Sequence, residues 1–77
     1  MNKLYIRLNS FDKIRNFVRI VDNLSYGIEL TSGDFIVDGK SILGIFALDL
    51  SDAIEINIID KSQKTNICPK ELEEFIA

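Results

Sequence analysis

The chain has 77 residues, of which 47% are hydrophobic and 27% are charged, a balance typical of a globular domain and not of a disordered chain. Its 9 basic and 12 acidic residues give a net charge of −3 without a basic cluster, which argues against direct binding to nucleic acid. It has no histidine and one cysteine, which removes the commonest general base, histidine-activated nucleophiles and zinc sites of familiar ligand set.

The sequence also bears on the cellular location of the protein and on its cofactors. No apolar run approaches the roughly 18 residues of a membrane-spanning helix, and the N-terminal sequence MNKLYIRLN lacks the apolar core of a signal peptide. We therefore expect one cytoplasmic domain over residues 1–77, without membrane contact, cofactor or metal, and without enzymatic activity. We interpret Cys68 as a small buried hydrophobic residue and not as a reactive thiol.

The first two elements follow from periodicity. Leu4, Ile6 and Leu8 alternate with polar positions, which predicts a half-buried strand over about residues 2–8. The next segment has helical spacing, with Ser10 as a plausible N-cap. The apolar face of this predicted helix contains Phe11, Ile14, Phe17, Val18 and Val21.

The remaining elements complete an α+β order. Strands are predicted over 26–31 and 35–37, joined by a turn, followed by a helix over 42–49 and a strand over 53–59. Residues 60–66 are predicted to be a polar linker, and a last helix is predicted to begin at Pro69. The order β-α-β-β-α-β with a terminal α predicts an open-faced β-sandwich, in which helices cover one face of a four-stranded antiparallel sheet.

A glycine-lysine-serine triplet at residues 39–41 raises the possibility of a phosphate-binding P-loop. Such a loop has four residues before its Gly-Lys pair, whereas Gly33 and Gly39 enclose five. Three of these five residues, Phe35, Ile36 and Val37, favour strands, so the segment lacks the glycine-rich character of a phosphate loop. We therefore expect no nucleotide site here.

The predicted second helix is apolar on every side between residues 42 and 48. A helix that covers a sheet buries only one stripe of its surface. If Ile45 and Leu48 face the sheet, then Leu43 and Phe46 project together elsewhere, and an exposed apolar patch of this kind marks a protein partner. The alternative is that the last helix folds over Leu43 and Phe46 and buries them.

The segment KSILG, residues 40–44, resembles HPr, the phosphocarrier protein of the bacterial sugar phosphotransferase system. The resemblance spans about residues 17–58, and the predicted order β-α-β-β-α-β-α is the HPr order. One departure is large, because Ser10 stands at the position of the family's phosphohistidine, with Asp12 at the position of an arginine and Lys13 at that of a proline. The resemblance therefore implies a histidine-less variant without phosphocarrier activity at this site.

The resemblance further implies a regulatory role. In the family, the serine that matches Ser41 is phosphorylated by HPr kinase, and Lys40, Leu43 and Phe46 match partner-binding positions. The implied partner is a transcriptional regulator or a component of the phosphotransferase system. Three alternatives stay open: Ser41 is only a helix cap, the protein is a phosphocarrier altered at Ser10 or elsewhere, or it is a structural module that forms homodimers through its sheet edges.

Overall fold

The computed structural model describes residues 3–60, 63–65 and 68–77. The elements are β1 (Leu4–Ile6), α1 (Phe11–Asp22), β2 (Gly27–Ser32), β3 (Phe35–Asp38), α2 (Ile42–Phe46), β4 (Ile54–Asp60), β5 (Gln63–Thr65) and a 3-10 helix, η1 (Lys70–Phe75). No helix in these described ranges combines the length and the apolar character that crossing a membrane requires.

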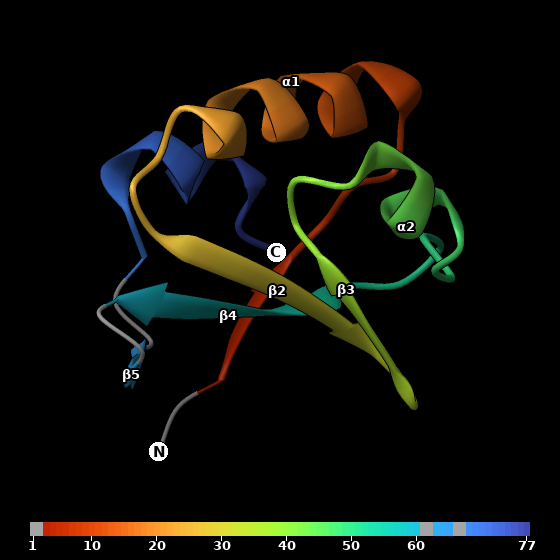
Figure 1. Cartoon of the computed structure of the whole chain (residues 1–77). Coiled ribbons are helices and arrows are strands. Elements are labelled where there is room, and N and C mark those ends of the chain that lie inside the picture. Colours follow the sequence, from red (N-terminus) through yellow and green to blue (C-terminus); the bar gives the residue numbers. More distant parts are fainter. Residues whose placement is uncertain (1–2, 61–62, 66–67) are drawn as a thin grey trace.

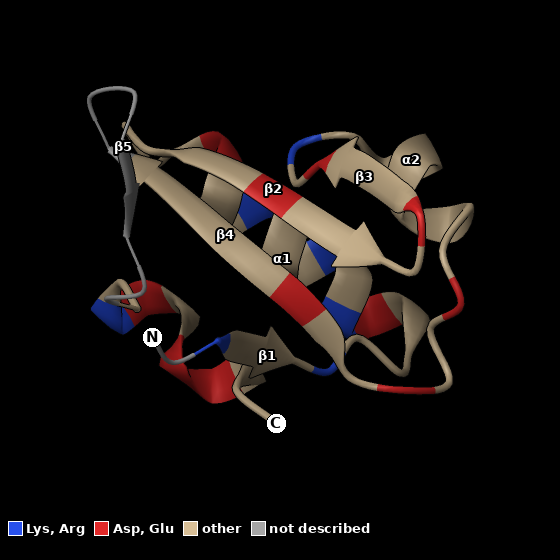
Figure 2. Ribbon diagram, turned by 90° about the horizontal axis from the view of Figure 1, so that it is seen from below, with Lys and Arg blue, Asp and Glu red and all other residues tan. Residues whose placement is uncertain are grey.

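The main sheet has four antiparallel strands in the order β1-β4-β2-β3. The α1 and α2 helices and η1 lie on one face of this sheet, and the other face is open (Figures 1 and 2). The predicted α+β class and the open four-stranded antiparallel sheet are thus confirmed. The bounds of β2, β3 and β4 differ from the predictions by only one residue at either end.

Strand alternation sends the apolar side chains toward the helices. Ile54, Ile56 and Ile58 of β4 are buried, and their cross-strand partners include Ile6, Leu30 and Ile28. Because successive side chains point to opposite faces, this register places the polar residues of β4 on the open face. The helix layer completes the core, and there the ring of Phe17 meets the ring of Phe75 edge-on, with 5.4 Å between centroids.

The end of the chain departs most from the sequence predictions. Residues 60–66 are not simply a linker, because β5 pairs with β4 in an antiparallel hairpin. The last helix, predicted to begin at Pro69, is the 3-10 helix over Lys70–Phe75, and residue 76 forms an isolated bridge with Ile6 of β1. The N–H of Ala77 donates to the carbonyl of Tyr5 at 3.0 Å, so this end of the chain continues the sheet beyond β1.

This arrangement decides between two interpretations of the second helix. Phe75 and Leu72 of η1 are buried against α1 and the core, not over α2. The suggestion that the last helix buries Leu43 and Phe46 is therefore wrong. The α2 helix also ends at Phe46 and not at 49, because a tighter turn follows, in which the N–H of Leu48 donates to the carbonyl of Ile45.

Candidate functional site

The two glycines before Lys40 have separate structural tasks. Gly33 has a φ of 59°, which the tight turn between β2 and β3 requires. Gly39 is buried where the chain leaves β3, and its N–H donates to the carbonyl of Ile28 at 2.8 Å. A Cβ on Gly39 would lie 2.6 Å from Cγ2 of Ile28, so only glycine fits without a shift. The segment between these glycines is a strand and its turns, which is consistent with the absence of a P-loop.

Ser41 begins α2 as its N-cap. Its φ of −97° and ψ of 104° are extended, and its Oγ accepts a hydrogen bond from the N–H of Gly44 at 3.1 Å. A Cβ on Gly44 would lie 3.1 Å from this Oγ and 3.2 Å from Cβ of Val37. The glycine of the KSILG segment therefore lets α2 approach both its own cap and β3.

The α2 helix divides its apolar side chains between the core and solvent. Ile45 is fully buried and Leu48, just after the helix, is also buried. Leu43 is 81% exposed and Phe46 is 47% exposed, and residues three apart are neighbours on a helix surface. The predicted division of these four residues between core and solvent is confirmed.

A third apolar residue joins this surface from α1. Phe11 is 57% exposed, and its ring stacks on that of Phe46 with a centroid distance of 6.0 Å and an interplanar angle of 18°. Its assignment to the buried stripe of α1 is thus wrong, because the first helical residue turns toward α2 instead of toward the sheet. We call Phe11, Leu43 and Phe46 the α1–α2 apolar surface.

Charged groups of α1 border the α1–α2 apolar surface. The guanidinium carbon of Arg15 lies 5.9 Å from the centroid of the Phe11 ring, a cation–π contact worth about 0.5–1 kcal/mol at an exposed site. Arg15 also pairs with Asp12 at 3.5 Å, and both side chains are mostly exposed. One turn further along, Arg19 donates to Oδ1 of Asn16 at 3.1 Å. The apolar surface therefore borders a helix face on which Arg15 and Arg19 alternate with Asp12 and Asp22.

Ser10 and Lys40 lie at the starts of α1 and α2. Ser10 is the N-cap of α1, and its Oγ accepts from the N–H of Lys13 at 3.2 Å. Lys40 is exposed, and its backbone N–H donates to Oδ1 of Asp38 at 2.9 Å. The sequence residues Lys40, Ser41, Leu43 and Phe46 thus lie together around α2, whereas Ser10 caps the neighbouring helix.

Within the described ranges, no three histidine, cysteine, aspartate or glutamate residues come together to hold a metal ion. Cys68 is half-buried against the core, and its Sγ lies 3.3 Å from the carbonyl oxygen of Pro69. Burial, assisted by the carboxylate of Glu73, raises the pKa of the Cys68 thiol above its ordinary value of 9.0. Packing against the core agrees with the interpretation of Cys68 as a structural residue.

The sequence pattern located Leu43 and Phe46 but missed Phe11. The only available signal was an aromatic side chain directly after an N-cap, which is equally compatible with burial on the sheet. No protein-family model, curated protein or solved structure matches this chain.

Proposed function

We propose that this chain is a cytoplasmic, HPr-like protein-binding module of βαββαβα architecture, without catalytic activity, that docks on its partner through the α1–α2 apolar surface. The observation that carries this proposal is the exposure of Leu43 beside the stacked rings of Phe46 and Phe11. Clustered apolar side chains on a water-facing surface are costly unless a partner covers them, and such clusters are typical of protein interfaces.

Charged groups border the apolar centre of this surface. Arg15 borders the ring of Phe11, and Lys40 precedes the capping residue of α2. An interface with an apolar centre and a border of charged groups is stabilised by a partner that presents apolar residues flanked by charges complementary to this border. In the HPr-like interpretation, this partner is a transcriptional regulator or a component of the phosphotransferase system.

Ser41 is the point at which this docking is regulated. Its side chain is exposed, and it lies two residues before Leu43. Phosphorylation by HPr kinase would add about −1.5 to −2 charges and three strong acceptors at the edge of the apolar surface. The phosphorylated protein would then select a partner that offers arginine or lysine side chains at this edge, beside the pocket for Leu43.

The test combines modification and binding. The chain is incubated with HPr kinase and ATP, and intact-mass and fragment analysis locates any phosphate. Binding of both forms to the catabolite-repression regulator of the family is then measured by calorimetry. We expect one phosphate at Ser41 and tighter binding of the modified form. A phosphate at Ser10 would instead support the altered phosphocarrier.

Two matched variants locate the interface. Phe46→Asp places a charge in the α1–α2 apolar surface and should abolish binding. Phe35→Asp makes the same change at an aromatic residue that is 66% exposed outside this surface, and it should bind normally. Circular dichroism checks that both variants fold. Equal loss of binding in both variants, or binding unaffected by Phe46→Asp, would contradict the proposed surface.

A further inference from the structure

One edge of the main sheet is open, and the opposite edge is covered. At the β1 edge, the N–H of Arg7 donates to the carbonyl of Phe75, and the N–H of Ala77 donates to the carbonyl of Tyr5. The other edge is formed by β3, which is the last strand of the order β1-β4-β2-β3 and lies at the outer margin of the sheet (Figure 2). In the described part of the chain, no strand pairs with the outer side of β3.

The register shows which backbone groups β3 presents outward. Directly opposite residues of an antiparallel pair alternate between hydrogen-bonded and non-hydrogen-bonded pairs. Gly39 donates to the carbonyl of Ile28, so this pair is hydrogen-bonded. Ile36 lies three residues before Gly39 and opposite Thr31, so the Ile36–Thr31 pair is non-hydrogen-bonded. The N–H and C=O of Ile36 therefore point away from β2, toward the open edge.

The backbone carbonyl of Asp38 also points away from β2, as this alternation requires. Asp38 occupies the same kind of pair as Ile36, and its carbonyl accepts from the N–H of Ser41 at 3.0 Å, outside the sheet. The connection from β3 to α2 thus satisfies the outward carbonyl of Asp38, whereas it makes no hydrogen bond to the outward N–H and C=O of Ile36. An edge strand with outward backbone groups is a template for pairing with another extended chain.

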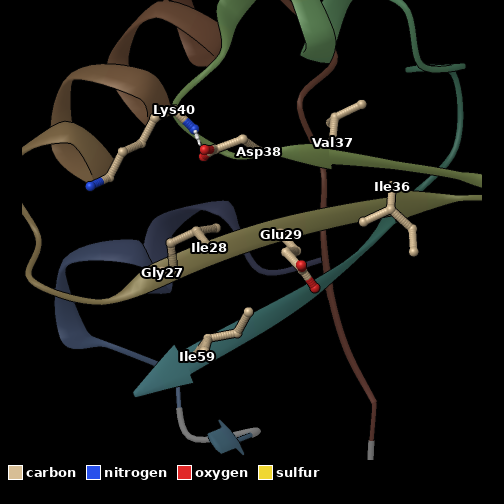
Figure 3. A pocket seen from close by; sticks show the side chains of 8 residues that line it. All are labelled: Gly27, Ile28, Glu29, Ile36, Val37, Asp38, Lys40 and Ile59. Carbon is tan, nitrogen blue, oxygen red and sulfur yellow. Dashed lines mark hydrogen bonds between the residues drawn. The ribbon is translucent and has the colours of Figure 1, made fainter. Parts of the chain in front are cut away.

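The side chains along β3 specify the chemistry of such a chain. Ile36 is 64% exposed on the open face, and Asp34 and Asp38 are exposed on either side of it. Glu29 of β2 lies directly opposite Asp38 in the register; the carboxylate of Asp38 turns toward the N–H of Lys40, from which it accepts at 2.9 Å, and that of Glu29 extends from the other side of the pair (Figure 3).

A hollow of 330 Å³ lies next to these carboxylates (Figure 3). Its lining includes the side chains of Glu29, Asp38, Ile36, Ile59 and Lys40, and Gly27 contributes no side chain. The side chain of Lys40 extends away from the carboxylate of Asp38 in this view. The hollow thus combines two carboxylates and one ammonium group with aliphatic walls, and the remaining negative charge suits a lysine side chain with its long apolar stem.

We propose that the β3 edge binds an extended basic segment of another protein as an additional strand. The backbone of the segment pairs with Ile36, and its lysine or arginine side chains on the open face reach Glu29 and Asp38. Charge disfavours a second copy of this chain in the register centred on Ile36. Self-pairing centred on Ile36 would place Asp34 of each copy opposite Asp38 of the other, and like charges directly opposite are destabilising.

The probe is the peptide TKVKVKT, acetylated and amidated, in which all lysines share one face of a strand. Amide spectra of the full chain are recorded by nuclear magnetic resonance during titration. We expect a dissociation constant of about 1 mM or tighter, with shifts centred on residues 35–38. The peptide TEVEVET should produce no such shifts. A TKVKVKT peptide with N-methylated lysines should bind at least about tenfold more weakly, because in an antiparallel pair the lysines on the open face are the residues whose N–H groups point toward Ile36.

Variants of the protein separate backbone pairing from charge. Ile36→Pro removes the outward N–H without removing a β2–β3 hydrogen bond, and it should weaken binding at least about tenfold. The double variant Glu29→Gln, Asp38→Asn should also weaken peptide binding at least about tenfold, and its affinity for the peptide should depend less on salt concentration. Phe46→Asp should leave binding unchanged, so this inference stands apart from the proposed function. Shifts confined to the α1–α2 apolar surface, equal binding of both peptides, concentration-dependent dimerisation through β3, or undiminished binding by folded Ile36→Pro would overturn it.

Discussion

Replacing Phe75 with alanine tests whether η1 is part of the core. The Phe75 side chain is only 4% exposed and meets the ring of Phe17 edge-on. Truncation of a buried phenylalanine costs about 3–5 kcal/mol, and loss of an aromatic pair accounts for about 0.5–1.5 kcal/mol beyond area burial. A chain of this length has a free energy of unfolding of about 4–11 kcal/mol. Phe75→Ala should therefore remove about 4 kcal/mol and leave the domain marginally stable.

Urea unfolding followed by circular dichroism measures this change in the free energy of unfolding. Phe35→Ala is the control, because it removes the same ring from an exposed position and should change the stability by about 0.5 kcal/mol or less. Phe75→Leu should give an intermediate loss, because it retains part of the buried volume. A loss of less than about 1 kcal/mol for Phe75→Ala would show that η1 does not pack on α1, and the argument that it leaves α2 uncovered would fail with it.

Four further outcomes can be measured on the same chain. Gly39→Ala should lower the free energy of unfolding by about 1–3 kcal/mol, because the added Cβ collides with Ile28. Gly33→Ala should lower it by about 1–2 kcal/mol, because residue 33 has a positive φ. Urea unfolding checks both, and Gly33→Asn should restore part of the loss. Ser10→Ala should cost about 1 kcal/mol in the same assay, whereas Ser10→Asp should retain the cap. Cys68 should react slowly with iodoacetamide at pH 8, then faster as the pH rises above 9.0, and fastest in urea, because its pKa is raised only in the folded chain.

Local pattern was enough to predict most of the fold. Alternation in β2, β3 and β4 and the helical spacing of α1 predicted these elements within one or two residues. The exposure of Leu43 and Phe46 was also predictable, because a short helix without a polar side cannot bury all its residues. The HPr resemblance, the role of Ser41 and the identity of the partner stay predictions.

Sequence periodicity did not predict the environment of residues that contact segments far away in the chain. Phe11 is compatible with burial on the sheet, and only the approach of α2 turns its ring toward Phe46. Residues 63–65 have no strand pattern of their own, and they form β5 because β4 offers an unpaired edge next to them. Residue 76 joins β1 for the same reason.

The sequence by itself determined the lack of histidine and of a second cysteine, the order of the main strands and helices, and the surplus of apolar residues around α2. Each of these depends on residue type and on spacing along a few turns or strand positions. Only the tertiary structure decided which surfaces stay open. It placed η1 on α1, added Phe11 to the surface of α2, closed the edge of β1 and left the edge of β3 unpaired. These outcomes depend on contacts between segments far apart in the chain, and local periodicity carries no information about them.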